Sequence, residues 1–221
     1  MTETQLQLNA DEDFDFASPD VAAKFDAHVR EQLPWYDLVT YGIAHIARHY
    51  LAHGGLVYDI GAATGNVGRI LMPTLQVRGA EFIPIDSSPE MEKVYNGPGT
   101  LRIRDAALSH FDPFDVAISN LTLVFMSIPA RTRLIARLKE NCKPGGCIII
   151  VEKVQGGGGY IDDVLYKLTL SNKLKAGAKP KEIISKELCL SGIQRPLEIS
   201  EVKDFRPWFV FGNFAGMIYE G

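Results

Sequence analysis

The sequence contains few cysteines, no excess of basic residues and no long hydrophobic run. Its cysteines are an odd number and form no C-x-x-C pair, which argues against a disulfide framework and against a zinc cluster; they are Cys142, Cys147 and Cys189. We expect them to be reduced and buried. The net charge of −4 is close to balance, so it gives no reason to expect DNA, RNA or an anionic membrane as a partner. It favours a small-molecule substrate.

No apolar stretch reaches the roughly 20 residues that a membrane-spanning helix needs. The first 15 residues are acidic, whereas a secretory signal has basic residues followed by an apolar run. We therefore expect a cytoplasmic protein in which residues 1–17 form a polar leader without a fold of its own. Residues 18–221 are enough to bury the core of a single α/β domain.

Apolar segments of strand length alternate with segments of helix length, which is typical of a parallel sheet covered by helices. The expected strands are 56–60, 79–85, 101–104, 116–119, 147–152, 201–206 and 215–219. The expected helices are 18–34, 41–51, 129–141, 160–173 and 180–191, and the last two form a helical insert over about 157–195. The stretch Lys143-Pro144-Gly145-Gly146 predicts a tight turn into the fifth strand.

A glycine turn that opens on an acid joins the first expected strand to the next helix. It reads Asp59-Ile60-Gly61-Ala62-Ala63-Thr64-Gly65. Because Gly61 and Gly65 have no Cβ, the backbone there can bend sharply and approach a ligand closely. The spacing differs from the G-x-G-x-x-G of dinucleotide enzymes, and the absence of Gly-Lys-Ser/Thr excludes a P-loop. The turn predicts a nucleotide pocket.

Polar residues end the next three expected strands. Asp86 ends the second, where an α/β nucleotide site places a carboxylate against the ribose hydroxyls. The same residue could instead cap the following helix, and the two roles are compatible. Asp105 and Asn120 end the third and fourth strands, at the sheet edge where open α/β folds bind ligands. Taken alone, either of these two residues is equally well explained by hydrogen bonds to loop backbone.

Together these residues carry a resemblance to a known family. Asp59-x-Gly61-x-x-x-Gly65, Asp86, Asp105, Asn120 and Pro144-Gly145-Gly146 resemble the class I S-adenosylmethionine (SAM) methyltransferase core, over about residues 56–152. Further stretches resemble the carboxy-SAM synthases of tRNA wobble-uridine modification: Ser88-Pro89-Glu90-Met91, Asn120-Leu121-Thr122-Leu123-Val124-Phe125, Glu152-Lys153, Trp208-Phe209 and Asn213-Phe214. The second likeness spans most of the chain.

The resemblance implies a Rossmann-like, mostly parallel seven-stranded sheet with N-terminal helices and a helical insert before the last two strands. It also implies a homodimer that binds SAM, or its product S-adenosylhomocysteine (SAH), across the strand ends. Asp59, Gly61, Ala62 and Gly65 would lie at the methionine part and Tyr36 over it. Asp86 and Ser87 would meet the ribose and adenine side, Asp105 and Ala106 the adenine, and Asn120 the reacting end.

One position departs from the carboxy-SAM synthases. These enzymes use an arginine in the second insert helix to hold the carboxylate of the modified cofactor, and a gapless alignment places Glu187 there. A glutamate would repel that carboxylate, and the neighbouring Lys186 would replace the arginine only as a point charge. We therefore carry over the fold and SAM binding, but not the carboxylation.

Two other sets of residues could carry function. His45, His49 and His53 recur at i, i+4 and i+8, but no carboxylate completes a metal site, so a solvated helix flank is the better interpretation. The insert is basic, with Lys173, Lys175, Lys179, Lys181 and Lys186. A solvated surface is favoured there, and the alternative is a site for an anionic substrate or a nucleic-acid backbone. The motif Asn120-Leu121-Thr122-Leu123 lacks the sequences that base-flipping DNA methylases use.

Three hypotheses of different kinds follow. The first is a SAM-dependent methyltransferase with an unidentified small acceptor. Methyl transfer from SAM requires no metal and no dedicated catalytic base, and the sequence indicates neither. The second, implied by the resemblance, is a carboxy-SAM synthase that uses SAM and prephenate. The third is a non-catalytic SAM-binding subunit.

Overall fold

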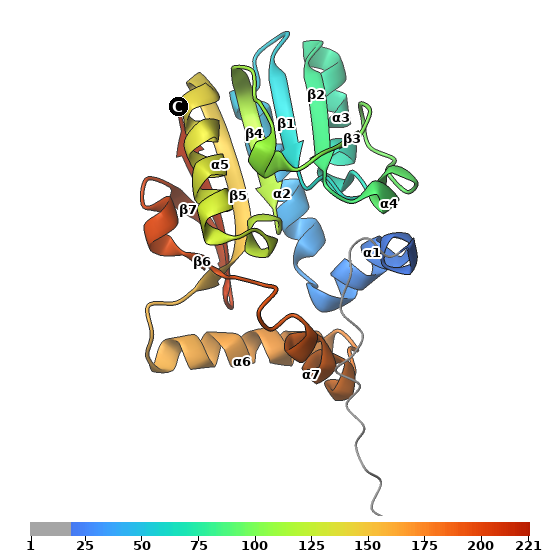
Figure 1. Cartoon of the computed structure of the whole chain (residues 1–221), viewed down its shortest axis with the longest axis vertical. Helices are drawn as coiled ribbons and strands as arrows, with labels where there is room; N and C mark the ends of the chain where they lie inside the picture. Colours follow the sequence, from blue (N-terminus) through green and yellow to red (C-terminus); the bar gives the residue numbers. More distant parts are fainter. Residues whose placement is uncertain (1–18) are drawn as a thin grey trace, which may run out of the picture.

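The computed structural model describes residues 19–221, so the leader predicted over residues 1–17 lies outside the described residues. The described chain forms a sheet with helices on both faces (Figure 1). The helices on the two faces and over the sheet end are α1 (Pro19–Gln32), α2 (Tyr36–Tyr50), α3 (Asn66–Arg78), α4 (Pro89–Glu92), α5 (Ile128–Asn141), α6 (Tyr160–Lys175) and α7 (Pro180–Cys189). Three short 3-10 helices are η1 (Ala106–Leu108), η2 (Leu123–Phe125) and η3 (Ile199–Val202).

The sheet has the strand order β3-β2-β1-β4-β5-β8-β7, and a short strand, β6, pairs with the end of β5 outside this order. The strands are β1 (Leu56–Ile60), β2 (Glu81–Asp86), β3 (Arg102–Ile103), β4 (Phe114–Asn120), β5 (Cys142–Gln155), β6 (Leu197–Glu198), β7 (Arg206–Phe211) and β8 (Phe214–Glu220). Strands β1 to β5 pair in parallel, whereas β8 is antiparallel to both β5 and β7. The predicted α/β class and mostly parallel sheet are confirmed.

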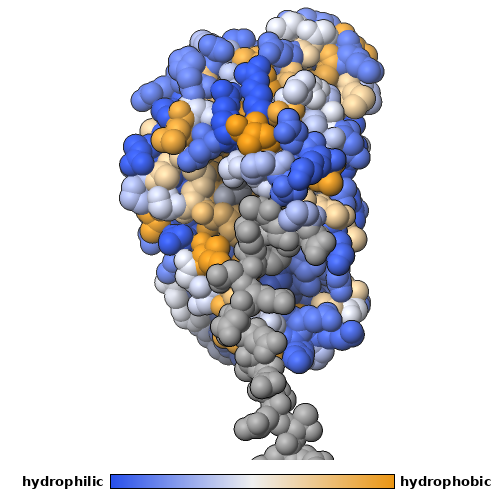
Figure 2. All heavy atoms as spheres, turned by 45° about the vertical axis from the view of Figure 1, so that its right-hand side comes forward, coloured by the Kyte–Doolittle hydropathy of each residue, from blue (hydrophilic) through white to orange (hydrophobic). Residues whose placement is uncertain are grey.

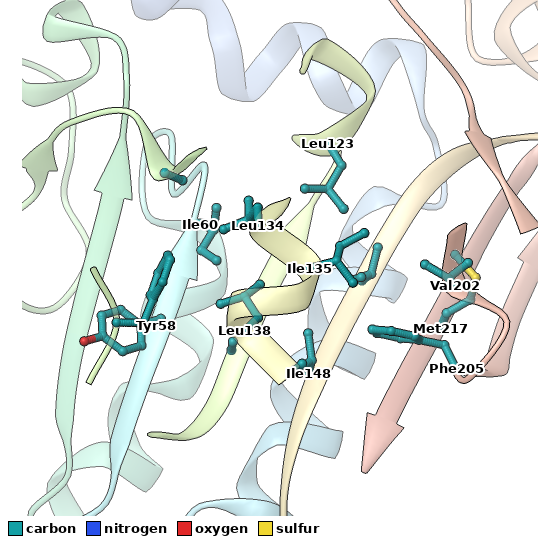
Figure 3. Packing of buried hydrophobic residues seen from close by; sticks show 14 of the residues in the cluster. Tyr58, Ile60, Leu123, Leu134, Ile135, Leu138, Ile148, Val202, Phe205 and Met217 are labelled. Carbon is teal, nitrogen blue, oxygen red and sulfur yellow. The ribbon is translucent and has the colours of Figure 1, made fainter. Parts of the chain in front are cut away.

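Successive residues of the central strands pack into different layers. Val57 of β1 packs with α2 and α3, whereas Tyr58 packs with α5. Leu134, Ile135 and Leu138 of α5 pack against this second face, as Figure 3 shows. Because both faces are covered, the strands read as continuous apolar runs instead of alternating patterns. That is why these strands are predictable from their residue pattern.

Two expected elements are wrong. Residues 201–206 do not form a strand, because Val202 and Phe205 point into the core at the spacing of a tight helical turn, and strand β7 begins only at Arg206. The stretch from Lys143 to Gly146 is not a turn before the fifth strand. It lies within β5 as an irregularity, since β4 pairs through Phe114 with Cys142 and then through Val116 with Cys147.

The helical insert lies across one end of the sheet. Helices α6 and α7 cross below the sheet in the view of Figure 1. Helix α1 lies at the same end and contacts α7 through His28 and Lys186. The insert's return path is anchored to the core, because the Arg195 amide donates a 2.7 Å hydrogen bond to the Val124 carbonyl. The insert therefore covers the sheet end to which the parallel strands point their carboxyl termini.

Hydrophilic and hydrophobic residues are interspersed on the face that Figure 2 shows. Within residues 19–221, no helix is long and apolar enough to cross a membrane.

The three cysteines are free, but the expectation that all are buried is wrong, because Cys142 and Cys189 are half-buried and only Cys147 is fully buried.

Candidate functional site

A cavity of about 840 Å³ lies at the carboxyl ends of β1, β2 and β4 and is covered by α1 and the insert. The predicted site residues in its lining are Tyr36, Asp59, Gly61, Ala62, Asp86, Ser87, Asp105, Ala106, Asn120, Lys186 and Glu187. Gly65 is the one predicted site residue outside the lining; it precedes α3 with a φ of 86° and packs against Gly97. The structure thus brings residues from six separate elements to one cavity.

The glycine turn is held close to neighbouring chain on two sides. The amides of Gly61 and Ala62 both donate to the Ile85 carbonyl, at 2.8 and 3.0 Å. Gly61 has a φ of 73°, and a Cβ built on it would lie 2.0 Å from the Oγ1 of Thr122. Glycine is required here by both conformation and space.

Asp86 ties the glycine turn to the start of α4. Its two carboxylate oxygens accept 2.9 Å hydrogen bonds from the amides of Ala63 and Ser88. The N-cap of α4 is Ser88, so Asp86 binds the backbone just before the helix and is not its N-cap. Because each carboxylate oxygen has a second lone pair, these bonds leave room for ligand hydroxyls. Asp105 has the same kind of contact, since its Oδ1 accepts a 2.7 Å bond from the Ala107 amide.

Three buried acceptor oxygens of the cavity lining have no hydrogen-bond partner in the described protein. They are Oε1 of Gln32, Oδ2 of Asp59 and Oδ1 of Asn120. Burial and the neighbouring charge of Asp86 raise the pKa of Asp59 to about 7. Buried polar groups without partners are rare in native proteins, so this side of the cavity is suited to a ligand with hydrogen-bond donors.

Glu152 shapes the loop that follows β4, a role that the sequence pattern did not reveal. Its carboxylate is fully buried and accepts hydrogen bonds from the amides of Thr122, Leu123 and Val124, at 2.8, 2.6 and 3.2 Å. Burial raises the pKa of Glu152 to about 8 despite these three donors. The loop that Glu152 fixes presents Thr122 to Gly61 and Asn120 to the cavity.

Helix α1 also belongs to the site, although none of its residues was predicted to line the cavity. Phe25, His28 and Gln32 of this helix line the cavity. Asp26 fastens α1 to the turn, accepting hydrogen bonds from Thr64 at 2.5 Å and from Asn66 at 2.8 Å. The apolar periodicity of the segment predicted the helix, but no local motif indicated where it would pack.

The insert end of the cavity carries a group of lysines around one glutamate. Glu187 accepts a 2.8 Å hydrogen bond from Lys173 and forms a 3.6 Å ion pair with Lys153. Burial would raise the pKa of Glu187, but these two lysines outweigh it and hold the pKa below its usual value. Lys186 contacts the Nε2 of His28 at 2.5 Å. We refer to these four residues, Lys153, Lys173, Lys186 and Glu187, as the lysine cluster.

The lysine cluster corrects the expectation that Glu187 makes this end repel an anion. Lys153 and Lys173 lie beside the Glu187 carboxylate, and Lys186, next to Glu187 in the chain, adds a third ammonium group. The four residues together are therefore cationic. The one arginine among the described lining residues is Arg104, which lies next to Asp105 in the chain. The forked guanidinium of the carboxy-SAM synthases is thus not replaced by another arginine in the described lining.

Two of the histidines that recur at four-residue spacing lie close together at the surface of α2. His45 and His49 are exposed on α2 with ring centroids 5.1 Å apart. In the part of the chain that the structure describes, no three His, Cys, Asp or Glu side chains are grouped to hold a metal ion.

No protein-family model matches the chain. The curated relatives include the carboxy-SAM synthase of Staphylococcus epidermidis, which is 29% identical over 217 residues, 92% of this chain and 95% of that protein. The carboxy-SAM synthase of Pseudomonas fluorescens is 26% identical, covering 92% of each chain. The resemblance predicted from the motifs is confirmed over most of the chain.

Among solved structures, the plantazolicin methyltransferase BpumL in complex with SAH superposes with a TM-score of 0.61. The match covers 94% of this chain and 91% of that one at 14% identity. This likeness confirms the predicted class I methyltransferase fold.

Proposed function

We propose that the protein is an enzyme that binds SAM in the cavity at the sheet end and transfers its methyl group to a small acceptor. The observation that carries the proposal is the meeting of a tight glycine turn, Asp86 and three unpartnered acceptor oxygens in one cavity. SAM as cofactor agrees with the names of the relatives and of the solved neighbour. The sheet topology places this cavity where open α/β folds bind their ligands.

The donors and acceptors of the lining fit SAM. Oδ2 of Asp59 and Oε1 of Gln32 need donors, and the methionine part of SAM has an ammonium group. Asp86 keeps lone pairs for ribose hydroxyls after its two backbone bonds. The amide of Ala106 and the neighbouring Asp105 would form hydrogen bonds with the edge of the adenine ring. Tyr36, which is 5% exposed, would cover the methionine end.

SAM brings the activation for the reaction, because its sulfonium group makes the methyl a good electrophile. The chain's own residues would align the acceptor with that methyl and exclude water. Helix α1 and the insert cover the cavity, and the loop held by Glu152 would place Asn120 at the reacting end. No base is assigned to this step.

Carboxy-SAM synthesis is the second candidate, and two observations favour it. The relatives carry that name over 92% of this chain, and the cationic lysine cluster removes the objection drawn from Glu187. By analogy with the family, prephenate would be the carboxyl source. Lysines offer point charges instead of the arginine fork, which is why methyl transfer is the leading candidate.

Mass spectrometry of the small molecule that remains on the freshly purified protein separates these candidates. SAM or SAH is expected from a methyltransferase and would justify an acceptor screen. Carboxy-SAM would establish the second candidate. SAM that stays unconverted with every acceptor tested would favour the third, a non-catalytic binding subunit.

We also propose a homodimer located in the cytoplasm, and we favour a small-molecule substrate over a nucleic-acid partner. The insert leaves large apolar side chains exposed, including Tyr160 at 82%, Ile184 at 54% and Leu188 at 53%. A second copy that packs on α6 and α7 would cover them, as the family resemblance implies. Light scattering on the purified protein should give twice the chain mass of 24.4 kDa; the monomer mass would contradict the dimer.

Asp86→Ala is expected to weaken SAM binding by about 1–3 kcal/mol, because the ribose hydroxyls lose a buried acceptor. The variant also frees the amides of Ala63 and Ser88, so calorimetric affinity should be measured together with thermal stability. Asp112→Ala, at an exposed position outside the cavity lining, is the control. Unchanged affinity in a folded Asp86→Ala protein would remove this residue from the site.

SAM affinity is expected to fall as the pH drops below 7. The pKa of Asp59 is raised to about 7 by burial and by Asp86, so its carboxyl becomes protonated below that pH in the ligand-free protein. A ligand ammonium favours the ionised form, and binding must then displace a proton, which costs up to about tenfold in affinity per pH unit. Calorimetry between pH 5.5 and 8 measures this slope. Asp59→Asn should flatten it, and an equal slope in the variant would assign the effect elsewhere.

A further inference from the structure

A polar network around Asp26 attaches helix α1 to the wall of the cavity. One carboxylate oxygen of Asp26 accepts hydrogen bonds from the Thr64 hydroxyl at 2.5 Å and from the Asn66 side chain at 2.8 Å. The other oxygen accepts from Arg69 at 3.3 Å. Arg30, one turn further along α1, donates to the Oδ1 of Asn66 at 3.1 Å. The network therefore joins α1 to the glycine turn and to the first residues of α3.

The two ends of α1 are held by different kinds of contact. At its carboxyl end, Trp35 is 7% exposed, and its ring centroid lies 5.3 Å from that of Phe209 and 5.0 Å from that of Phe214. Nearer its start, Ala22 and Phe25 pack in a small apolar cluster with residues of the glycine turn and α4. If the network around Asp26 opens, α1 can therefore swing about the segment that joins it to α2.

The network lies where it can open. The side chains of Asp26, Arg30 and Arg69 are 40%, 38% and 30% exposed. Water can replace the partners of groups this exposed, and each such ion pair stabilises the fold only slightly. Burial would raise the pKa of Asp26, but the hydrogen bonds from Thr64 and Asn66 and the two nearby arginines hold it below its usual value. Asp26 is thus ionised near pH 7 and stays the central acceptor.

Gln32, on the last turn of α1, shows why this freedom matters. It lines the cavity and is 7% exposed, and its Oε1 is buried without a partner in the described protein. A ligand donor can reach this oxygen only while α1 is displaced. Once α1 has returned, Gln32 and Tyr36 together cover the end of the cavity that the proposed function assigns to the methionine part of SAM.

We infer that Asp26 is a positioning residue that closes α1 over the bound cofactor, which enters while the network is open and is enclosed when the network forms. The inference rests on the proposed function, since the enclosed ligand is SAM or SAH. Asp26 lies outside the cavity lining, so it acts through α1 and the glycine turn. Because the network forms after entry, it slows the release of the ligand and not its arrival.

The test is stopped-flow fluorescence on the full chain with SAH, which measures the association and dissociation rates separately. Asp26→Ala should raise the dissociation rate at least about tenfold and change the association rate less than about threefold. Thr64→Val removes a donor on the turn side, also outside the lining, and should raise the dissociation rate by about threefold or more.

Asp37→Ala is the matched control. Asp37 pairs with the same Arg30 at 2.9 Å, but from α2 and with a side chain that is 65% exposed. Both rates should stay within about twofold of the wild type. Equal acceleration in this variant would overturn the inference, as would a wild-type dissociation rate in folded Asp26→Ala or a loss confined to association. If Asp26→Ala does not fold, Thr64→Val decides in the same way.

Hydrogen exchange measured by mass spectrometry supplies a second readout. SAH should slow the exchange of the α1 amides in the wild type and much less in Asp26→Ala. Asp26→Asn keeps one acceptor oxygen for Thr64 and should recover part of this protection; equal protection in all three proteins would contradict the role of Asp26. If SAH binds the wild type and no variant changes its release, only this inference fails. If SAH does not bind the wild type, the proposed function fails with it.

Discussion

Gly61→Val is expected to lower SAM affinity by at least about 100-fold, or roughly 2.7 kcal/mol. The first atom of any side chain at this position would lie 2.0 Å from the Oγ1 of Thr122. Thr122 cannot retreat easily, because its amide is held by Glu152 and its hydroxyl donates to the Ile60 carbonyl at 3.1 Å. The turn must therefore move, and the cavity wall moves with it. Calorimetry with SAM and SAH measures the loss.

The control separates steric collision from backbone strain. Gly54 has a φ of 67°, close to that of Gly61, but a Cβ there would meet nothing within 4 Å. Gly54→Ala should lose some stability and keep its SAM affinity. Gly61→Ala meets the same Thr122 oxygen, so it should resemble the valine variant. A folded Gly61→Val protein with wild-type affinity would mean that the turn does not form the ligand site.

The second large effect is expected on stability, from Arg131→Met. Arg131 lies on α5 with a fully buried side chain, and it donates to both carboxylate oxygens of Glu201, at 2.7 and 2.5 Å. Its guanidinium also donates to the carbonyls of Arg195 and Pro196. Methionine fills a similar volume without donors, so Glu201 is left with an unpaired and largely buried charge. Loss of one partner of such a pair costs about 3–5 kcal/mol.

Urea unfolding followed by circular dichroism measures this change. Lys139→Met is the matched control, because Lys139 lies on the same helix and pairs with Asp204 of the same return segment, but near the surface. Solvent screens such a pair, and its loss should have a much smaller effect. Equal destabilisation of the two variants would show that the buried pair is not a specific anchor of the insert's return path.

The sequence predicted those parts of the fold whose cause is local. The strands buried on both faces appear as apolar runs, and β1 from Leu56 to Ile60 was placed to the residue. The glycine turn and the polar residues that end β2 and β4 were also predictable, because chain direction alone brings the carboxyl ends of parallel strands to one edge. For Asp86, both alternatives rested on local geometry. The structure shows its bond to the amide of Ser88, and Ser88 is itself the N-cap of α4.

The remaining features depend on contacts between distant segments. Glu187 read as a charge of the wrong sign until the structure placed Lys153 of β5 and Lys173 of α6 beside it. The expected strand at 201–206 fails for a related reason, since Val202 and Phe205 follow the shape of the core surface and not a local periodicity. No single-sequence pattern contains that information.

The arrangement around Glu152 also sets how the loop after β4 can open. One carboxylate accepts from three successive amides, those of Thr122, Leu123 and Val124. Withdrawal of that carboxylate would expose all three amide protons to solvent together, so their hydrogen exchange should follow one common opening event instead of fraying residue by residue. The loop next to Asn120 would then open as one cooperative unit, with either all three hydrogen bonds to Glu152 formed or none of them.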